Sequence, residues 1–428
     1  MSATTAQNDS QVSLLDLASN IMKQTAKITA YLEANNLPEP TFDQDAPAPP
    51  ATSEYRTIHR SLVASLDELR RLTDGPYPTL RSFICQGNDL AAFHIAFEFE
   101  FFNIVPLDSG MELTELAEKA GLDVDRTGRV MRMLATHHVF KEPRPGYFVH
   151  TSLSSLYQRS PDSYAAGHYS VDEMLKAATG AAAALKAAPF ESDSEHCGFN
   201  TANGLPMFQF YAKNPGHAKR FAKAMAGATS VDRQISELRD SYDWNTLKGT
   251  VVDVGGGSGH VSVSLAQNFP HLNFVVQDNS QDMLDAAKHV STSPDVAERI
   301  SYMKHDFFEA QPVKNAAAFF MRQCTHNWCD RDVVRIFKGI VPGLEASGPG
   351  VPFLINDTII PEPGSIPLHE ERALRQMDLL MMIGLGAKQR TRAEFAALLK
   401  EADQRYEIIN AYAEGSSMGL LEVQLKAN

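Results

Sequence analysis

The sequence of 428 residues has little of what marks a disulfide-rich, secreted or membrane protein. Its four cysteines (Cys85, Cys197, Cys324 and Cys329) show no framework or metal-ligand spacing, so we expect free thiols and no bound metal. No apolar run approaches 18 residues, and the first twenty residues lack a basic patch followed by an apolar core. These absences predict a cytoplasmic protein with neither a membrane span nor a secretory signal.

Basic residues are in the minority, with 39 Lys and Arg against 52 Asp and Glu and a net charge of −13. An excess of negative charge opposes sequence-independent binding to phosphates, so we expect no nucleic acid among the partners. The balance of 43% apolar and 21% charged residues is that of an ordinary globular protein. Because 428 residues exceed what one hydrophobic core usually serves, two or more domains are expected.

Changes of composition along the chain predict four segments. Amphipathic helices are expected over about 11–35 and 54–72, separated by a stretch rich in proline and alanine. The segments are an N-terminal helical arm at 1–75, a winged-helix-like dimerisation domain at 76–165, a helical connector at 166–240 and a ligand-binding α/β domain at 241–428.

The second segment has the pattern helix, turn, helix, wing. Thr114 is the predicted N-cap of its first helix and Gly121 the C-terminal stop, a second helix follows over about 125–138, and "VFKEPRPGYFVH" predicts a hairpin. Between residues 111 and 150 there are six basic and six acidic residues, so the module has no electrostatic footprint for DNA. We therefore expect a winged helix used for packing or dimerisation.

After residue 247 short apolar runs alternate with helical stretches, which is typical of a parallel sheet covered by helices on both faces. A Rossmann-like α/β domain is therefore expected. The predicted strands are 251–254, 273–277, 316–321 and 351–355, and the predicted helices are 259–268, 281–289, 331–345 and 369–383.

The stretch "VVDVGGGSGH" places Gly255, Gly256 and Gly257 directly after the first of these strands. Residues without Cβ atoms let the backbone approach a ligand at the carboxyl end of a parallel strand. No Lys-Ser/Thr pair follows, so this is not a phosphate-binding P-loop. Asp253, two residues before the first glycine, suits a ligand with an amine rather than a pyrophosphate, or else orders the loop.

Two further acids follow strands, one after 273–277 and one in a third strand region, "ISYMKHDFF". Asp278 ends "NFVVQD", where a carboxylate can accept both ribose hydroxyls, although it could instead be a helix N-cap. Asp306 and Phe307, in "HDFF", combine an acid with an aromatic face and suit an adenine. Ribose, adenine and amine without phosphate describe S-adenosylmethionine, and NAD is the alternative for the glycine loop.

With these motifs the sequence resembles the class I S-adenosylmethionine-dependent O-methyltransferases of the caffeic-acid and fungal secondary-metabolite type. The likeness runs from about residue 80 to 420 and includes "DVGGGSGH", "VVQD", "HDFF", "FMRQCTHNWCDRD", "LINDTIIPEPG" and "MDLLMMIGLGAKQRT", in the family's order. It implies a homodimer that uses S-adenosylmethionine to methylate a hydroxyl group.

The resemblance also implies roles for single residues. His326 matches the family's general base, and Asp357 matches the first of two acids that flank it. Gln389 stands where the second acid is usual, which weakens the expected support for a charged histidine. Arg322 matches a basic residue near the cofactor, and Met225 lies in the segment that closes over it.

The substrate class is predicted from the residue types expected to line the site. Met377 and Met381 predict a flexible apolar lining that suits a flat phenolic or polyketide-type metabolite, although they could equally be ordinary core residues. Two other functions compete with methyl transfer. One is a cofactor-assisted cyclisation or pericyclic rearrangement, whose enzymes tend to lose the histidine that this chain keeps. The other is a DNA-binding or structural protein, which the neutral winged helix disfavours.

Overall fold

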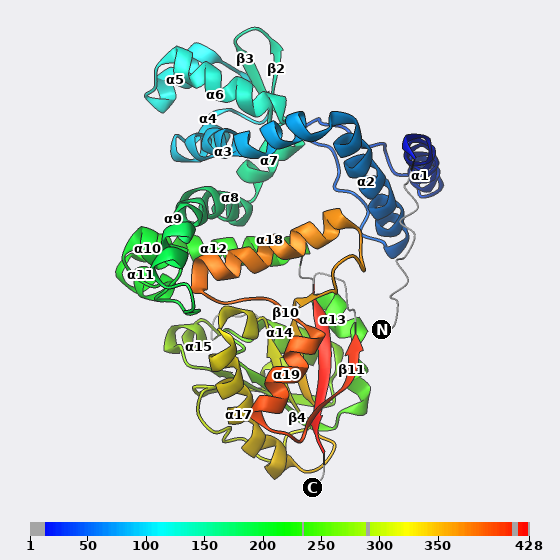
Figure 1. The fold of residues 1–428 in the computed structure, drawn as a ribbon, viewed down its shortest axis with the longest axis vertical. Helices are drawn as coiled ribbons and strands as arrows, with labels where there is room; N and C mark the ends of the chain where they lie inside the picture. Colours follow the sequence, from blue (N-terminus) through cyan, green and yellow to red (C-terminus); the bar gives the residue numbers. More distant parts are fainter. Residues whose placement is uncertain (1–12, 233–234, 288–291, 413–417, 427–428) are drawn as a thin grey trace, which may run out of the picture. The chain divides into compact units, whose positions relative to one another are not determined.

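The computed structural model describes residues 13–232, 235–287, 292–412 and 418–426, and the chain divides into two compact units (Figure 1). The first unit comprises Met1–Val171 with Pro367–His369, and the second comprises Asp172–Ile366 with Glu370–Asn428. Within the described ranges no helix combines the length and apolarity needed to cross a membrane.

The first unit is mostly helical. Its long helix α1 begins with a capping box, in which the Ser13 hydroxyl accepts from the Asp16 amide at 3.1 Å, and it packs beside α2. The apolar centre of the unit contains Phe97, Phe102 and Phe148, all nearly or fully buried. The helices are α1 Leu14–Ala34, α2 Ser53–Asp74, α3 Pro76–Glu98, α4 Phe101–Ile104, α5 Leu113–Ala120, α6 Val124–Thr136, α7 Ser152–Arg159 and α8 Pro161–Tyr169.

The winged-helix pattern is confirmed, with one correction. After α5 and α6 come the antiparallel strands β2 (Phe140–Arg144) and β3 (Tyr147–His150), and β1 (Met111–Glu112) completes their sheet. Gly121 ends α5 in the left-handed conformation, as expected. Thr114 is not the N-cap, because the helix already begins after Glu112. The Leu113 amide donates to the Gly146 carbonyl at 2.7 Å, and this contact with the hairpin starts the helix earlier.

The second unit begins with a helical region and continues into the α/β domain. The first helical elements are η1 Ser170–Met174, α9 Leu175–Ala187, α10 Gly198–Asn203, α11 Met207–Lys213, α12 Pro215–Asp232, α13 Ile235–Ser241 and η2 Trp244–Thr246. The later helices are α14 His260–Asn268, α15 Gln281–Ala287, α16 Pro294–Ala297, η3 Thr325–Asn327, α17 Asp330–Ser347, α18 Leu368–Leu385 and α19 Arg392–Ala402.

A seven-stranded sheet forms the centre of this domain, in the order β11-β12-β8-β7-β4-β5-β6. The strands from β8 to β6 are parallel, whereas at the other edge β12 pairs antiparallel with both β8 and β11. The bounds are β4 Gly249–Val254, β5 Leu272–Asp278, β6 Ile300–Lys304, β7 Ala318–Arg322, β8 Phe353–Asp357, β11 Tyr406–Tyr412 and β12 Gly419–Leu425, with a separate parallel pair of β9 Ile359–Ile360 and β10 Arg390–Thr391.

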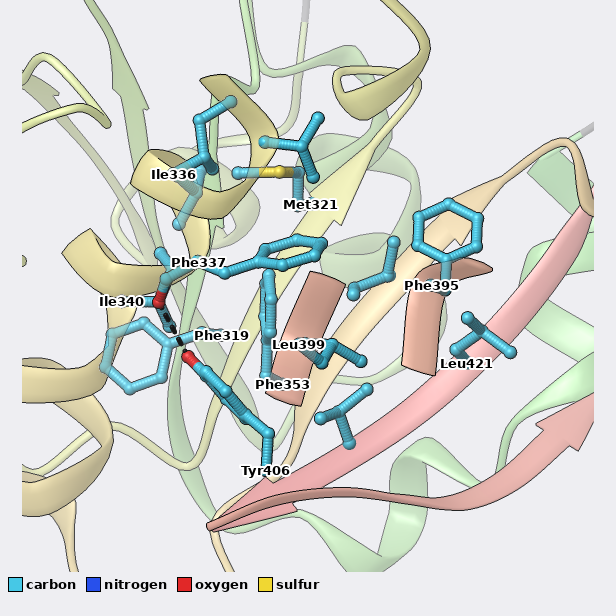
Figure 2. Close-up of a cluster of buried hydrophobic side chains, with 14 of the residues drawn as sticks. Phe319, Met321, Ile336, Phe337, Ile340, Phe353, Phe395, Leu399, Tyr406 and Leu421 are labelled. Atoms are coloured by element: carbon cyan, nitrogen blue, oxygen red, sulfur yellow. Dashed lines mark hydrogen bonds between the residues drawn. The ribbon is translucent and has the colours of Figure 1, made fainter. Parts of the chain in front are cut away.

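Helices cover both faces of the sheet, and successive strand residues alternate between them. Val252, Phe319 and Phe353 face a cluster formed with α17 and α19, in which the Tyr406 hydroxyl donates to the Phe337 carbonyl at 2.8 Å (Figure 2). Their neighbours along the strands pack on the opposite face with α14. Strands buried on both faces read as continuous apolar runs, which is why the sequence revealed them.

The predicted α/β alternation is confirmed to within a few residues at each boundary. All four predicted strands and all four predicted helices occur, although the strand predicted at 316–321 begins at Ala318 and the one predicted at 351–355 begins at Phe353. Residues 11, 12, 288 and 289, which were included in predicted helices, lie outside the described residues. The strands β11 and β12 had not been predicted.

Candidate active site

The glycine loop leaves β4 at the carboxyl edge of the sheet and is packed tightly from below. Gly255 and Gly257 have φ values of 74° and 58°, which strain residues with side chains. A Cβ atom on Gly255 would lie 2.8 Å from the Cys324 sulfur, and one on Gly256 would lie 2.6 Å from Cγ of Asp253. The loop therefore favours glycine at these positions, and all three glycines are half-buried.

Asp253 lies beneath this loop and is 2% exposed. Its carboxylate accepts a hydrogen bond from the Ser262 hydroxyl on α14 at 2.6 Å and faces Gly256. Burial raises the pKa of Asp253 to about 6, although the bond from Ser262 and the positive charge of Arg322 oppose this shift. Of the two roles expected from the sequence, this geometry favours ordering of the loop.

Two more carboxylates lie at the same edge. Asp278 ends β5 and accepts from the amides of Gly257 at 3.0 Å and Ser280 at 2.8 Å, so it joins the glycine loop to the next turn. Asp306 follows β6 and accepts from the Phe308 amide at 3.0 Å. The carboxyl ends of neighbouring parallel strands are where ligands bind in open α/β sheets.

Phe307 and Arg322 flank the loop. The Phe307 ring would lie 3.5 Å from a Cβ atom on Gly255, and Arg322, at the end of β7, donates a hydrogen bond to the Asn356 side-chain oxygen. The residues that the sequence assigns to the cofactor thus lie at or just beyond the carboxyl ends of β4, β5, β6 and β7, and their binding role stays a prediction.

The turn that carries His326 begins at a left-handed residue. Gln323 follows β7 with φ of 53°, and its amide donates to the Asn356 carbonyl at 2.9 Å. This conformation is costly for a residue with a side chain, and such sites persist where the surrounding structure determines them. The chain then enters the short 3₁₀ helix η3, which presents His326 beside the end of β8.

His326 and Asp357 form a buried pair. The His326 Nδ1 atom lies 2.5 Å from Oδ1 of Asp357, whose other oxygen accepts from the Thr325 hydroxyl at 2.6 Å and the His326 amide at 3.2 Å. Burial by itself would raise the pKa of Asp357, but the charge of His326 and these hydrogen bonds outweigh it and lower the pKa to about 2. An ionised carboxylate at this place selects the tautomer with its proton on Nδ1. The Nε2 atom makes no hydrogen bond to the described residues.

Gln389 immediately precedes β10 and is 3% exposed. Its amide donates to Oδ1 of Asp378 on α18 at 2.8 Å, whereas neither Nε2 nor Oε1 of its side chain has a partner among the described residues. Met377 and Met381 lie on either side of Asp378 in sequence, one helical turn apart and half-buried. Met225 lies on α12 and is 36% exposed.

Sequence reasoning missed three residues at this site. Ser262 pairs with Asp253, Thr325 supports Asp357, and Arg390 donates to backbone carbonyls of the turn around His326. The only available signal was position, because all three lie within or next to the motifs quoted above.

The comparisons with known proteins agree with this arrangement. Residues 183–405 match the O-methyltransferase domain family, and residues 88–160 match the O-methyltransferase dimerisation domain. The first match covers more than half of the chain, which therefore belongs to the S-adenosylmethionine-dependent O-methyltransferases with an N-terminal dimerisation domain.

Individual relatives support the same assignment. The O-methyltransferase sol2 of Alternaria solani is 56% identical over 97% of this chain and 96% of its own length. The chlorophenol O-methyltransferase of Trichoderma longibrachiatum is 34% identical over 96% of this chain and 89% of its own length. Among solved structures, that of a pericyclic-reaction enzyme matches with a TM-score of 0.71 at 19% identity, over 95% of this chain and 100% of that one, which shows a shared fold alone.

Proposed function

We propose that this O-methyltransferase methylates a hydroxyl of a small phenolic or polyketide-type secondary metabolite, with His326 as general base. The observation that carries the proposal is the buried pair of His326 and an ionised Asp357, next to the glycine loop at the carboxyl edge of the sheet. The likeness to a chlorophenol O-methyltransferase supports a phenolic acceptor.

A phenol is a poor nucleophile until it loses its proton. The gap between an ordinary phenol, with a pKa of about 10, and an ordinary histidine, at about 6.5, corresponds to roughly 5 kcal/mol. Asp357 supports the base in two ways, because its hydrogen bond holds the proton on Nδ1 and its negative charge compensates the positive charge that the imidazole gains when it takes the proton. The Nε2 atom of His326 is then the basic atom that takes the proton of the acceptor.

The cofactor-binding role is assigned to the loop and the acids around it. S-adenosylmethionine, when bound, supplies a methyl group on a positively charged sulfur, which favours a nearby phenolate. The residues proposed to hold it are Gly255, Gly256, Gly257, Asp278, Asp306, Phe307 and Arg322, while Asp253 orders the loop from beneath. They fit the group, because the loop backbone is free of side chains and two carboxylates at the sheet edge can accept from its ribose and adenine.

The substrate-binding role is assigned to Met225, Met377 and Met381. Methionine side chains adapt to irregular apolar shapes, which suits a planar metabolite. Gln389 contributes a neutral amide where the family usually has an acid, so of the two acids that the resemblance implies beside the base, this chain keeps Asp357. The unpartnered amide can still donate or accept a hydrogen bond. Gln389→Glu is expected to raise kcat, and an unchanged kcat would count against a catalytic role for this position.

The pericyclic alternative draws on the structural likeness, which by itself does not distinguish the two reactions. The retained pair of His326 and Asp357 favours transfer, because a rearrangement does not require removal of a proton by this pair.

We also propose a homodimer formed through the first unit. Four large apolar side chains on α3 are more than half exposed, which is unusual on the surface of a monomer, and a dimerisation domain gives them a natural partner in a second copy. They are Tyr77, Leu80, Phe83 and Ile84. In this proposal residues 1–75 are the arm, 76–165 the dimerisation domain, 166–240 the connector and 241–428 the catalytic domain.

The decisive experiment incubates the purified protein with methyl-labelled S-adenosylmethionine and a panel of chlorophenols and phenolic polyketides. We expect label in at least one phenol, at a rate that His326→Ala lowers by about two to four orders of magnitude to a small residual rate. The matched control is His271→Ala, which removes an exposed histidine that directly precedes β5, at the amino-terminal ends of the parallel strands. This variant is expected to keep the activity. Cofactor binding without transfer to any phenol would instead favour the non-methylating alternative.

A further inference from the structure

Arg390 is a fully buried arginine with no assigned part in the reaction. Its side chain is 0% exposed, and each of its three nitrogens donates a hydrogen bond. The Nη1 atom donates to the carbonyls of Thr325 at 3.0 Å and Lys388 at 3.2 Å, Nη2 donates to the carbonyl of Trp328 at 2.8 Å, and Nε donates to Oδ1 of Asp330 at 2.8 Å.

Two of these carbonyls bracket His326 in the chain. Thr325 precedes it by one residue and Trp328 follows it by two, so the guanidinium spans the turn that presents the histidine. The turn is a 3₁₀ helix of three residues with only short-range bonds of its own, such as that from the Trp328 amide to the Thr325 carbonyl at 3.2 Å. Such short helices have weak internal geometry, so their position depends on outside contacts.

The strand that carries Arg390 is also tied to the partner of the base. In the parallel pair of β9 and β10, Arg390 lies opposite Ile359, two residues beyond Asp357. One residue therefore connects the segment that carries the histidine with the segment that carries the carboxylate.

The chemistry of the side chain suits this task. A buried guanidinium is costly unless its donors and its charge are satisfied, and here backbone carbonyls take the donors while Asp330 supplies the opposite charge. Its planar fork can reach two carbonyls at fixed separation, whereas the single ammonium of lysine cannot reproduce this geometry.

We propose that Arg390 is a positioning residue that holds the His326 turn in register with Asp357. This inference rests on the proposed role of His326 as base. A base must be held close to the proton it removes, and a misplacement of about 1 Å can lower the rate by about a hundredfold.

The test is Arg390→Lys in the full-length protein, compared with Arg299→Lys. Arg299 is a matched control, because it also donates to backbone carbonyls, those of Ala266 at 2.7 Å and Leu272 at 2.9 Å, at the opposite edge of the sheet. With a chlorophenol as acceptor, Arg390→Lys should lower kcat by roughly tenfold to a hundredfold. The KM for the phenol and the affinity for S-adenosylhomocysteine should change less than about twofold.

A second measurement isolates the action through the histidine. In the background of His326→Ala, Arg390→Lys should cause no further loss of rate, because the group it positions is gone. Equal loss in both backgrounds, or a loss of S-adenosylhomocysteine affinity that parallels kcat, would assign Arg390 to general stability and overturn the proposal. Full activity of Arg390→Lys would overturn it as well.

A third measurement needs no acceptor. The proton between His326 and Asp357 should give a resonance far downfield of the amides, identified by its absence in His326→Ala. We expect Arg390→Lys to shift or abolish it and Arg299→Lys to keep it; an unchanged resonance in Arg390→Lys refutes the positioning role. If no phenol is methylated even by the unaltered protein, the proposed function fails, and this resonance still decides the inference. If Arg390→Lys does not fold, Asp330→Asn, which removes the half-exposed carboxylate on Nε, is expected to shift the same resonance.

Discussion

The pair of His326 and Asp357 makes a quantitative prediction for Asp357→Asn. The substitution keeps the shape of the side chain but removes its charge, and it turns one of its two acceptor oxygens into a donor. In the unaltered protein, Oδ2 of Asp357 accepts from the Thr325 hydroxyl and the His326 amide. A side-chain nitrogen in place of Oδ2 would leave at least the His326 amide N–H without its acceptor. The variant therefore loses both the negative charge beside His326 and a buried hydrogen bond.

The magnitude follows from the pKa of Asp357, which is lowered from 3.8 to about 2. At about 1.36 kcal/mol per unit, this difference contributes about 2 kcal/mol to the free energy of unfolding. Because the folded pKa lies below the unfolded one, the contribution is complete above about pH 4 and disappears as the pH falls toward about 2. The variant should thus be less stable than the unaltered protein at pH 7, and the difference should shrink in acid.

Urea unfolding at pH 7, 5 and 3, followed by tryptophan fluorescence, measures this difference. Trp244 and Trp328 both lie in the unit that contains the pair, so the signal reports on the relevant domain. Asp240→Asn is the control, because Asp240 pairs with Arg239 at the exposed surface, where solvent screening leaves little net effect. A difference for Asp357→Asn that is the same at pH 7 and pH 3 would refute the reasoning. The kcat should also fall by roughly two to four orders of magnitude, since the histidine loses its tautomer support.

Three further substitutions test other parts of the protein. Gly256→Ala places a methyl group 2.6 Å from Cγ of buried Asp253, so calorimetry should show about tenfold weaker binding of S-adenosylhomocysteine, whereas Gly216→Ala, with open space around its Cβ position, should keep the affinity. Asp253→Asn removes an acid whose folded pKa of about 6 lies above its unfolded value of 3.8. The free energy of unfolding of this variant, relative to that of the unaltered protein, should therefore rise by about 3 kcal/mol between about pH 4 and about pH 6. A difference that stays constant with pH would contradict the buried-acid assignment. Ile84→Glu should convert the dimer to a monomer in sedimentation velocity, and a persistent dimer would exclude this face of α3 as the interface.

Features with a local signal could be predicted from the sequence. The inner parallel strands β8, β7, β4 and β5 are largely buried on both faces, so they appear as apolar runs. The glycine loop appears because positive φ and close packing require glycine at fixed positions. The prediction for Thr114 was wrong because a contact from outside the local segment, between Leu113 and Gly146, decides where the helix begins. The strands β11 and β12 were missed, since their role as an antiparallel edge depends on pairing with β8 and with each other.

The sequence by itself determined the alternation of parallel strands and helices in the α/β domain and which polar residues follow each of these strands. Only the tertiary structure decided which of these residues meet. His326 and Asp357 are 31 positions apart, and Arg390 lies 65 positions from the carbonyl of Thr325 that it holds. The direction of a buried side chain and the length of its hydrogen bonds are set by packing between distant segments, and no local pattern of residues encodes them.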